Sequence, residues 1–142
     1  MGLMFKTASQ EIELTVRGYE CPILTRSYWD NNWLVLSCRS TTGDKTICGE
    51  LPCFMTTELC DLQIRLKQFQ NGVISSVSWN GTEPNLVITL NENRVLSIFF
   101  YGENEDDSVV FSKHASPRDV RRFIDFCEDC LSSYPIREFG IK

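Results

Sequence analysis

The sequence predicts an α+β fold, with a largely antiparallel β-sheet of about six strands and two α-helices packed against it. The first observation behind this prediction is that apolar residues alternate at every second position in some segments and follow helical spacing in others. The second is the order of these segments, which runs strands, helix, strands, helix. With 142 residues, of which 42% are hydrophobic, the chain is long enough to bury a core, and we expect one domain over residues 1–142.

The first strands are expected at residues 11–17 and 33–39, where polar and apolar side chains alternate. A third strand at residues 45–50 is placed to pair with the second across the turn Thr42-Gly43-Asp44. This alternation is typical of strands that bury one face and expose the other.

The first helix is expected to begin at Thr56, where the spacing of apolar residues changes to that of a helix. Thr56 is a suitable N-cap with Glu58 in the first turn, and Asn71-Gly72 is a suitable end. The stripe expected to be buried consists of Leu59, Leu62, Leu66 and Phe69.

Three further strands are expected at residues 74–79, 86–90 and 94–101. The turn Asn91-Glu92-Asn93 predicts that the last two form an antiparallel hairpin. Residues 109–111 add a possible short strand.

The second helix is expected to begin at Ser116-Pro117-Arg118-Asp119, which combines a capping serine, a proline at the first helical position and an acid near the free N–H groups. The stripe expected to be buried consists of Val120, Phe123, Ile124, Cys127 and Leu131.

The charge of the chain argues against nucleic acid as its partner. The formal net charge is -5, whereas phosphate binding requires an excess of lysine and arginine. The first 70 residues carry eight acids and seven bases, and the remaining residues carry eleven acids and seven bases. The acidity is therefore concentrated in the second half.

A loop with four acids in six residues, at positions 102–107, is the densest acidic cluster. It lacks the alternating ligands, central glycine and final glutamate of an EF-hand. Three interpretations remain open: a solvated loop, a protein-binding patch or a cation site. The acids concerned are Glu103, Glu105, Asp106 and Asp107.

The second helix places its charges against the helix dipole. Its first turns carry Arg118, Arg121 and Arg122, and its last turns carry acids, which costs some 0.3 to 1 kcal/mol per charge. Local preferences that are broken in this way tend to mark function, although a solvated helix face is the alternative. The acids lie on one face outside the apolar stripe and are Asp125, Glu128 and Asp129.

Catalytic motifs are absent from the sequence. His114 is the single histidine, in a loop without a patterned nucleophile, and the glycines stand alone at turns rather than in a phosphate-binding loop. We therefore expect no enzymatic activity and no cofactor. No apolar stretch reaches the length of a membrane span and no signal sequence opens the chain, so we expect a cytoplasmic protein without membrane contact.

The chain has seven cysteines, of which Cys127 and Cys130 form a Cys-x-x-Cys pair near the end of the second helix. Both lie on its apolar side, which favours buried structural thiols over a redox pair. A zinc site would need a second pair of ligands, and Cys48 with Cys53 is the only candidate nearby in sequence.

Two runs carry more information than composition, namely Tyr28-Trp29-Asp30-Asn31-Asn32-Trp33-Leu34 and Glu83-Pro84-Asn85-Leu86, each leading into a strand. Together they resemble the immunity proteins of the WapI family. Thr57-Glu58-Leu59 at the helix start and Tyr134-Pro135-Ile136-Arg137 near the end extend the resemblance over residues 20–137. Asn31 stands where the family has glycine, which asparagine can replace in a left-handed turn conformation.

The resemblance implies a bacterial protein that binds the toxic C-terminal domain of a secreted polymorphic toxin, often a nuclease. An acidic surface suits that role, because the substrate groove of a nuclease is basic. Trp29, Trp33 and Asn85 are interpreted as structural, so no toxin contact is assigned to them. The alternative is a small metal- or ligand-binding protein that uses Cys127 and Cys130 or the acidic loop. The expected partner-binding residues are Glu103, Glu105, Asp106, Asp107, Asp125, Glu128 and Asp129.

Overall fold

The computed structural model describes residues 2–21, 23 and 31–137, which form an α+β fold with two antiparallel sheets. The first sheet has the order β1-β2-β3-β4 and the second the order β5-β6-β7-β8. The expected count of about six strands is thus too low by two. The bounds are β1 (Gly2–Lys6), β2 (Gln10–Tyr19), β3 (Trp33–Thr42), β4 (Lys45–Met55), β5 (Val77–Asn80), β6 (Leu86–Leu90), β7 (Val95–Phe100) and β8 (Val109–His114).

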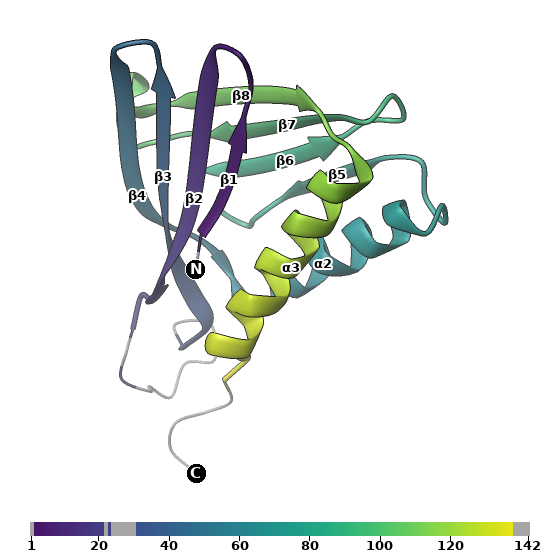
Figure 1. Cartoon of the computed structure of the whole chain (residues 1–142). Coiled ribbons are helices and arrows are strands. Elements are labelled where there is room, and N and C mark those ends of the chain that lie inside the picture. Colours follow the sequence, from purple (N-terminus) through teal and green to yellow (C-terminus); the bar gives the residue numbers. More distant parts are fainter. Residues whose placement is uncertain (1, 22, 24–30, 138–142) are drawn as a thin grey trace.

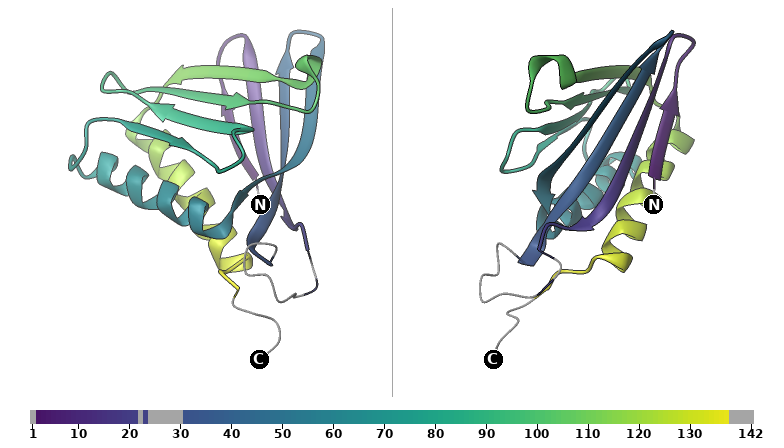
Figure 2. Two further views of the ribbon diagram at one scale, coloured as in Figure 1. Left: turned by 180° about the vertical axis from the view of Figure 1, so that it is seen from behind. Right: turned by 90° about the vertical axis from the view of Figure 1, so that its left-hand side faces the viewer.

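Two helices, α2 (Thr56–Gln70) and α3 (Pro117–Ser133), confirm the expected positions, and a short 3₁₀ helix η1 (Glu105–Asp107) lies in the acidic loop. The two sheets run crosswise to each other, and the helices lie side by side at one end of them (Figure 1). The views in Figure 2 show the same arrangement from behind and from the side. In the described part of the chain, no helix is both long and apolar enough to cross a membrane.

The sheets pack through their apolar inner faces. Phe5 of β1 stacks on Phe111 of β8 with ring centroids 6.4 Å apart, and its ring contacts that of Phe123 of α3 in a tilted arrangement with centroids 6.1 Å apart. Gly49 allows β4 to approach β7 closely, because a Cβ atom at this position would lie only 2.5 Å from the ring of Phe100. These contacts join residues far apart in sequence, so the core holds both sheets and α3 together.

The helix starts differ in how well the sequence predicts them. Ser116 caps α3 as expected: its side chain accepts a hydrogen bond from the backbone N–H of Asp119 at 3.1 Å. The expectation that Thr56 caps α2 is wrong, because the cap position is Met55, whose N–H donates to the carboxylate of Glu58 at 3.0 Å. Thr56 is the first helical residue, and its buried hydroxyl donates to Asn32 Oδ1 at 3.0 Å.

The outer strands of both sheets are protected from further strand pairing. Arg122 of α3 donates to the carbonyl of Met4 in β1, and η1 contacts β4. In the second sheet, Arg65 donates to the carbonyl of Ser78 at 2.8 Å and Gln10 to that of Val110 at 2.9 Å. Side chains at sheet edges disfavour the addition of a foreign strand. A partner is therefore more readily bound by side chains and clefts than by strand addition.

Candidate functional site

The structure separates the expected partner-binding residues into two groups. The acidic loop with η1 packs against β4, whereas α3 packs against β1. Since β1 and β4 are the opposite edges of the first sheet, the two groups lie on different sides of the molecule (Figure 1). The seven acids therefore do not form one continuous patch.

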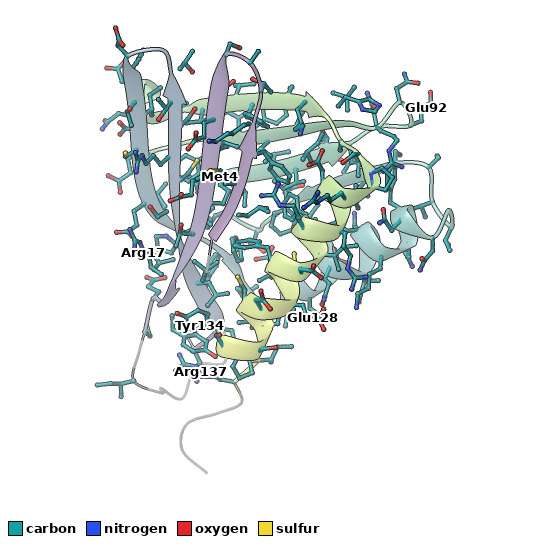
Figure 3. The ribbon with its side chains drawn as sticks, viewed as in Figure 1. Met4, Arg17, Glu92, Glu128, Tyr134 and Arg137 are labelled. Atoms are coloured by element: carbon teal, nitrogen blue, oxygen red, sulfur yellow. The ribbon has the colours of Figure 1, made fainter. Side chains whose placement is uncertain are left out.

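The group on α3 is solvated and partly paired. Asp125 forms an ion pair with Arg121 at 3.2 Å, and Glu128 and Asp129 are exposed. Glu128 projects from α3 at the surface of the molecule (Figure 3). Arg122, one of the arginines at the start of the helix, packs on the core, because its guanidinium lies 5.3 Å from the centre of the Phe5 ring. The unfavourable charge order of this helix thus has a partial explanation in packing.

The acidic loop folds tightly onto itself beside β4. Asn104 Nδ2 donates to the carboxylate of Asp107 at 3.3 Å, and the carbonyl of Asn104 accepts from the N–H of Asp107 at 3.0 Å. Gly102 lies so close to Asp107 that a Cβ atom would be 2.4 Å from the Asp107 Cβ. Glu103 and Asp106 are exposed, and the side chain of Glu105 is outside the described part of the structure. A hollow of about 200 Å³ lies between this loop and β4.

A larger cleft of about 430 Å³ opens next to this loop. It brings the expected residue Glu103 together with two acids that the sequence analysis missed, Glu20 and Glu83. All three are exposed, and none forms an ion pair or a side-chain hydrogen bond with the residues described here. The remaining lining residues are Trp33, Leu51, Pro52 and Asn85.

Backbone hydrogen bonds hold the walls of this cleft in place. The N–H of Glu20 donates to the carbonyl of Trp33 at 2.9 Å, which ties the end of β2 to the start of β3. Asn85 is fixed to Tyr101 in both directions: its side-chain amide donates to the Tyr101 carbonyl at 2.7 Å, and its own carbonyl accepts from the Tyr101 N–H at 2.7 Å. These bonds bring the segment with Glu83 and the segment with Glu103 side by side.

Glu58 fixes the same region from the side of α2. Its carboxylate accepts hydrogen bonds from the N–H and the hydroxyl of Thr82, at 2.5 and 3.2 Å, next to Glu83. Gly81 permits the loop to approach β4, because a Cβ atom there would lie 2.7 Å from the carbonyl oxygen of Cys53. The cleft is therefore largely preformed in the absence of a partner.

The motif segments that contain Asn32 and Arg137, which lie about a hundred residues apart in sequence, contact each other next to the start of β3. The side-chain oxygen of Asn32 accepts from the N–H of Arg137 at 2.7 Å, and its amide donates to the Arg137 carbonyl at 2.8 Å. The guanidinium donates to the carbonyls of Asn31 and Cys21 and lies 3.6 Å from the centre of the Tyr19 ring. Arg137 and Tyr134 lie together below the end of α3 (Figure 3). We call this assembly the Arg137 clamp.

The clamp corrects one expectation. Asn31 is buried and helical, and Arg94 is the one non-glycine residue with a positive φ in the described ranges. The expected left-handed conformation of Asn31 is therefore wrong. The structural interpretation of Trp33 and Asn85 is incomplete rather than wrong, because both also line the cleft. Trp29, which was interpreted in the same way, lies outside the described residues.

Comparison with known proteins identifies the family. The sequence model of the immunity protein WapI-like family matches residues 3–135, which is most of the chain. The chain belongs to this family. No curated protein and no solved structure matches the chain. The family assigns an immunity role, and its match includes all the described residues that line the cleft.

The cysteines of this immunity protein do not form a metal site in the described structure. Cys127 and Cys130 are fully buried, and burial raises the pKa of both thiols, to about 12 for Cys130. Within the residues described, no group of three or more His, Cys, Asp or Glu side chains is arranged to hold a metal ion. The alternative of a metal-binding protein therefore gains no support from the geometry. His114 is exposed at the end of β8.

Proposed function

We propose that this protein is a cytoplasmic immunity protein of a bacterial polymorphic toxin system, which binds the toxic C-terminal domain of its cognate toxin and blocks it by occlusion. The observation that carries the proposal is a cleft whose three carboxylates, Glu20, Glu83 and Glu103, form no ion pair with a described residue, in a chain of an immunity family. A concave site lined by one sign of charge attracts partners of the opposite sign and speeds their association.

The proposal includes the nature of the toxin surface. A toxin that cleaves nucleic acid needs a basic groove for phosphate groups, and such a groove is complementary to the acidic rim. The carboxylates, the indole of Trp33 and the amide of Asn85 in the cleft can bind cations and backbone groups of a partner protein. Inhibition by binding alone requires one immunity protein per toxin molecule, and the chain would have no enzymatic role.

The proposed contact surface centres on the cleft and the acidic loop. Glu103 belongs to both, and Asp106 and Asp107 extend the acidic rim along β4. Glu105 remains a prediction. A protein interface of standard size covers about 800 Å² on each partner. Because the acids of α3 lie beyond the opposite edge of the first sheet, we place them outside the centre of the interface, although the sequence alone ranked them equally.

The test uses the toxin domain encoded beside the gene of this protein. The purified immunity protein and toxin domain are mixed at increasing ratios, and both complex formation and toxin activity are measured. We expect a 1:1 complex and complete inhibition near equimolar ratio. Absence of a complex would refute the proposal. Inhibition at ratios far below one would refute occlusion and indicate an enzymatic action on the toxin instead.

A further inference from the structure

We propose that the cleft is the receptor for a single arginine side chain of the toxin, with the guanidinium group against Trp33 and between the carboxylates of Glu83 and Glu103. This inference rests on the proposed function and specifies its central contact. It assigns a role in recognition to the cleft that Trp33 and Asn85 line. From the sequence motifs, these two residues were interpreted as structural.

The size and lining of the cleft fit one long side chain. Ligand pockets have volumes of about 300 to 1,000 Å³, and a cleft of about 430 Å³ lies near the lower end of this range, so it can admit one long side chain. Trp33, Leu51 and Pro52 provide apolar surface for the stem of such a side chain, and the acids provide negative charge for its head. A long cationic residue combines these two properties.

The charge of the cleft favours a cation from outside. Among the described residues, its lining contains three acids and neither lysine nor arginine. Some acids elsewhere have cationic partners, as in the pairs Lys6 with Glu11, Arg17 with Glu50 and Lys113 with Asp119. The cleft gathers three acids whose charge no described residue compensates by an ion pair.

The arrangement of the acids favours an organic cation over a metal ion. Glu20, Glu83 and Glu103 belong to three separate segments, and among the described residues they do not form a group that could hold a metal ion. Calcium requires several oxygen atoms within about 2.3 to 2.6 Å. A guanidinium group is broad and has five N–H donors, so it can contact carboxylates that are too far apart for an ion.

Arginine fits better than lysine for two reasons. Its planar group stacks on aromatic rings, with tryptophan the best partner, and it forms paired hydrogen bonds to carboxylates. The protein itself uses this arrangement, because Arg137 lies 3.6 Å from the centre of the Tyr19 ring while its guanidinium donates to two carbonyl groups. Arginine and tryptophan are also enriched among residues that dominate interface energies.

The first experiment examines the cleft without the toxin. N-acetyl-arginine amide is titrated into the full chain labelled with ¹⁵N, and the indole N–H signal of Trp33 is followed by NMR after assignment with Trp33→Phe. We expect a saturable shift. N-acetyl-citrulline amide, which has nearly the same shape but no charge, should give none, and N-acetyl-lysine amide should bind more weakly. Equal responses to arginine and citrulline, or to arginine and lysine, would overturn the proposal.

Variants locate the binding. Glu83→Gln and Glu103→Gln should each weaken arginine amide binding by about two- to fivefold, the range of a partly exposed ion pair. Both side chains are exposed, so the substitutions should leave the fold intact. Glu128→Gln on α3 is the matched control and should leave binding unchanged. Equal weakening by the control would show that general charge, not the cleft, attracts arginine.

A second experiment separates this inference from the proposed function. If the toxin domain forms no complex while arginine amide still titrates Trp33, the proposed function fails and the cleft remains a guanidinium site. If the complex forms with equal affinity in the Glu83→Gln, Glu103→Gln double variant, the function stands and the arginine contact is refuted. The expected result is that the double variant binds the toxin domain more weakly. One toxin arginine should then be found whose replacement by alanine weakens binding to the wild type but not to the double variant.

Discussion

The acids beside β4 and the acids at the end of α3 are similar in sequence but differ in surroundings. Glu103 beside β4 lines the larger cleft and forms no ion pair with a described residue, whereas Asp125 on α3 pairs with Arg121 on an open helix face. A concave, apolar surround strengthens the field of a charge, and open solvent weakens it. The comparison teaches that acid density alone does not locate a binding site. Surface shape and existing ion pairs decide between the two groups.

The largest expected effect concerns the Arg137 clamp, which holds the start of β3 beside the cleft. Arg137→Ala removes the hydrogen bonds to Asn31 and Cys21 and the stacking on Tyr19, which together hold the start of β3 and thus Trp33. We expect a loss of about 3 kcal/mol in the free energy of unfolding, since hydrogen bonds to a charged group contribute about 1.5 to 3 kcal/mol. Urea denaturation measures this loss.

Arg118→Ala on α3 is the control for this prediction. Arg118 is exposed and forms no ion pair or side-chain hydrogen bond with the described residues, so its loss should change the free energy of unfolding by less than about 0.5 kcal/mol. Similar effects of the two variants would mean that the Arg137 clamp does not stabilise the frame of the cleft.

The next effect concerns Asp119 at the start of α3, whose substitution should lower the stability of the fold more than substitution of the acids at the end of the helix. Burial alone would raise the pKa of Asp119, but the hydrogen bond from the Ser116 N–H and the contact with Lys113 outweigh it and hold the pKa below its ordinary value. Asp119→Ala should cost about 1 to 2 kcal/mol at pH 7 through loss of the capping interaction. Asp125→Ala, which removes an exposed ion pair, should cost less than about 0.5 kcal/mol.

The pH dependence gives this prediction a second test. Because the pKa of Asp119 is lower in the folded state than in the unfolded state, its charge stabilises the fold above the unfolded value of about 3.9. This contribution is lost as the pH falls through the folded value. The stability difference between the wild type and Asp119→Ala should therefore be constant from pH 7 to 5 and shrink below about pH 4. A difference that persists unchanged at low pH would contradict the assignment.

A smaller effect is expected on toxin binding. The Glu83→Gln, Glu103→Gln double variant should slow association with the toxin domain by about tenfold at low salt, because a concave acidic site steers a basic partner toward it. The difference from the wild type should narrow as salt is added, since the Debye length falls to about 3 Å at 1 M. Stopped-flow measurement of the association rate at several salt concentrations tests this. A change confined to the dissociation rate would place these acids outside the region of first encounter.

The sequence predicted the elements well where the evidence is local. Alternation located β2 and β3, and the signal at Ser116 located the start of α3. It missed β1, because a strand of five residues with only Leu3 and Phe5 facing inward is too short for a pattern. It also predicted one sheet instead of two, since the packing of Gly49 on Phe100 depends on residues fifty positions apart.

The candidate site was predicted only in part for the same reason. Glu103 belongs to a dense acidic run and was therefore visible in the sequence, while Glu20 is an isolated acid with no local signal and Glu83 was noticed only as part of a motif. Trp33 and Asn85 were noticed as motif residues, but their position in a cleft follows from the meeting of β3, β4 and the loop before β6. The motifs drew attention to the segments that contain Trp33 and Asn85, but they did not show that these segments line the same cleft in the fold.

The smallest expected effect is at the end of α3. Charge reversal by Asp125→Lys and Asp129→Lys should leave toxin affinity and its salt dependence within about twofold of the wild type, since these residues lie beyond β1 and away from the cleft. Stability should change by less than about 0.5 kcal/mol, because the lost pair with Arg121 is exposed and positive charge suits the end of a helix. Titration calorimetry at two salt concentrations measures affinity, and urea denaturation measures stability. A tenfold loss of affinity would restore the α3 acids to the interface and show that the toxin spans both edges of the first sheet.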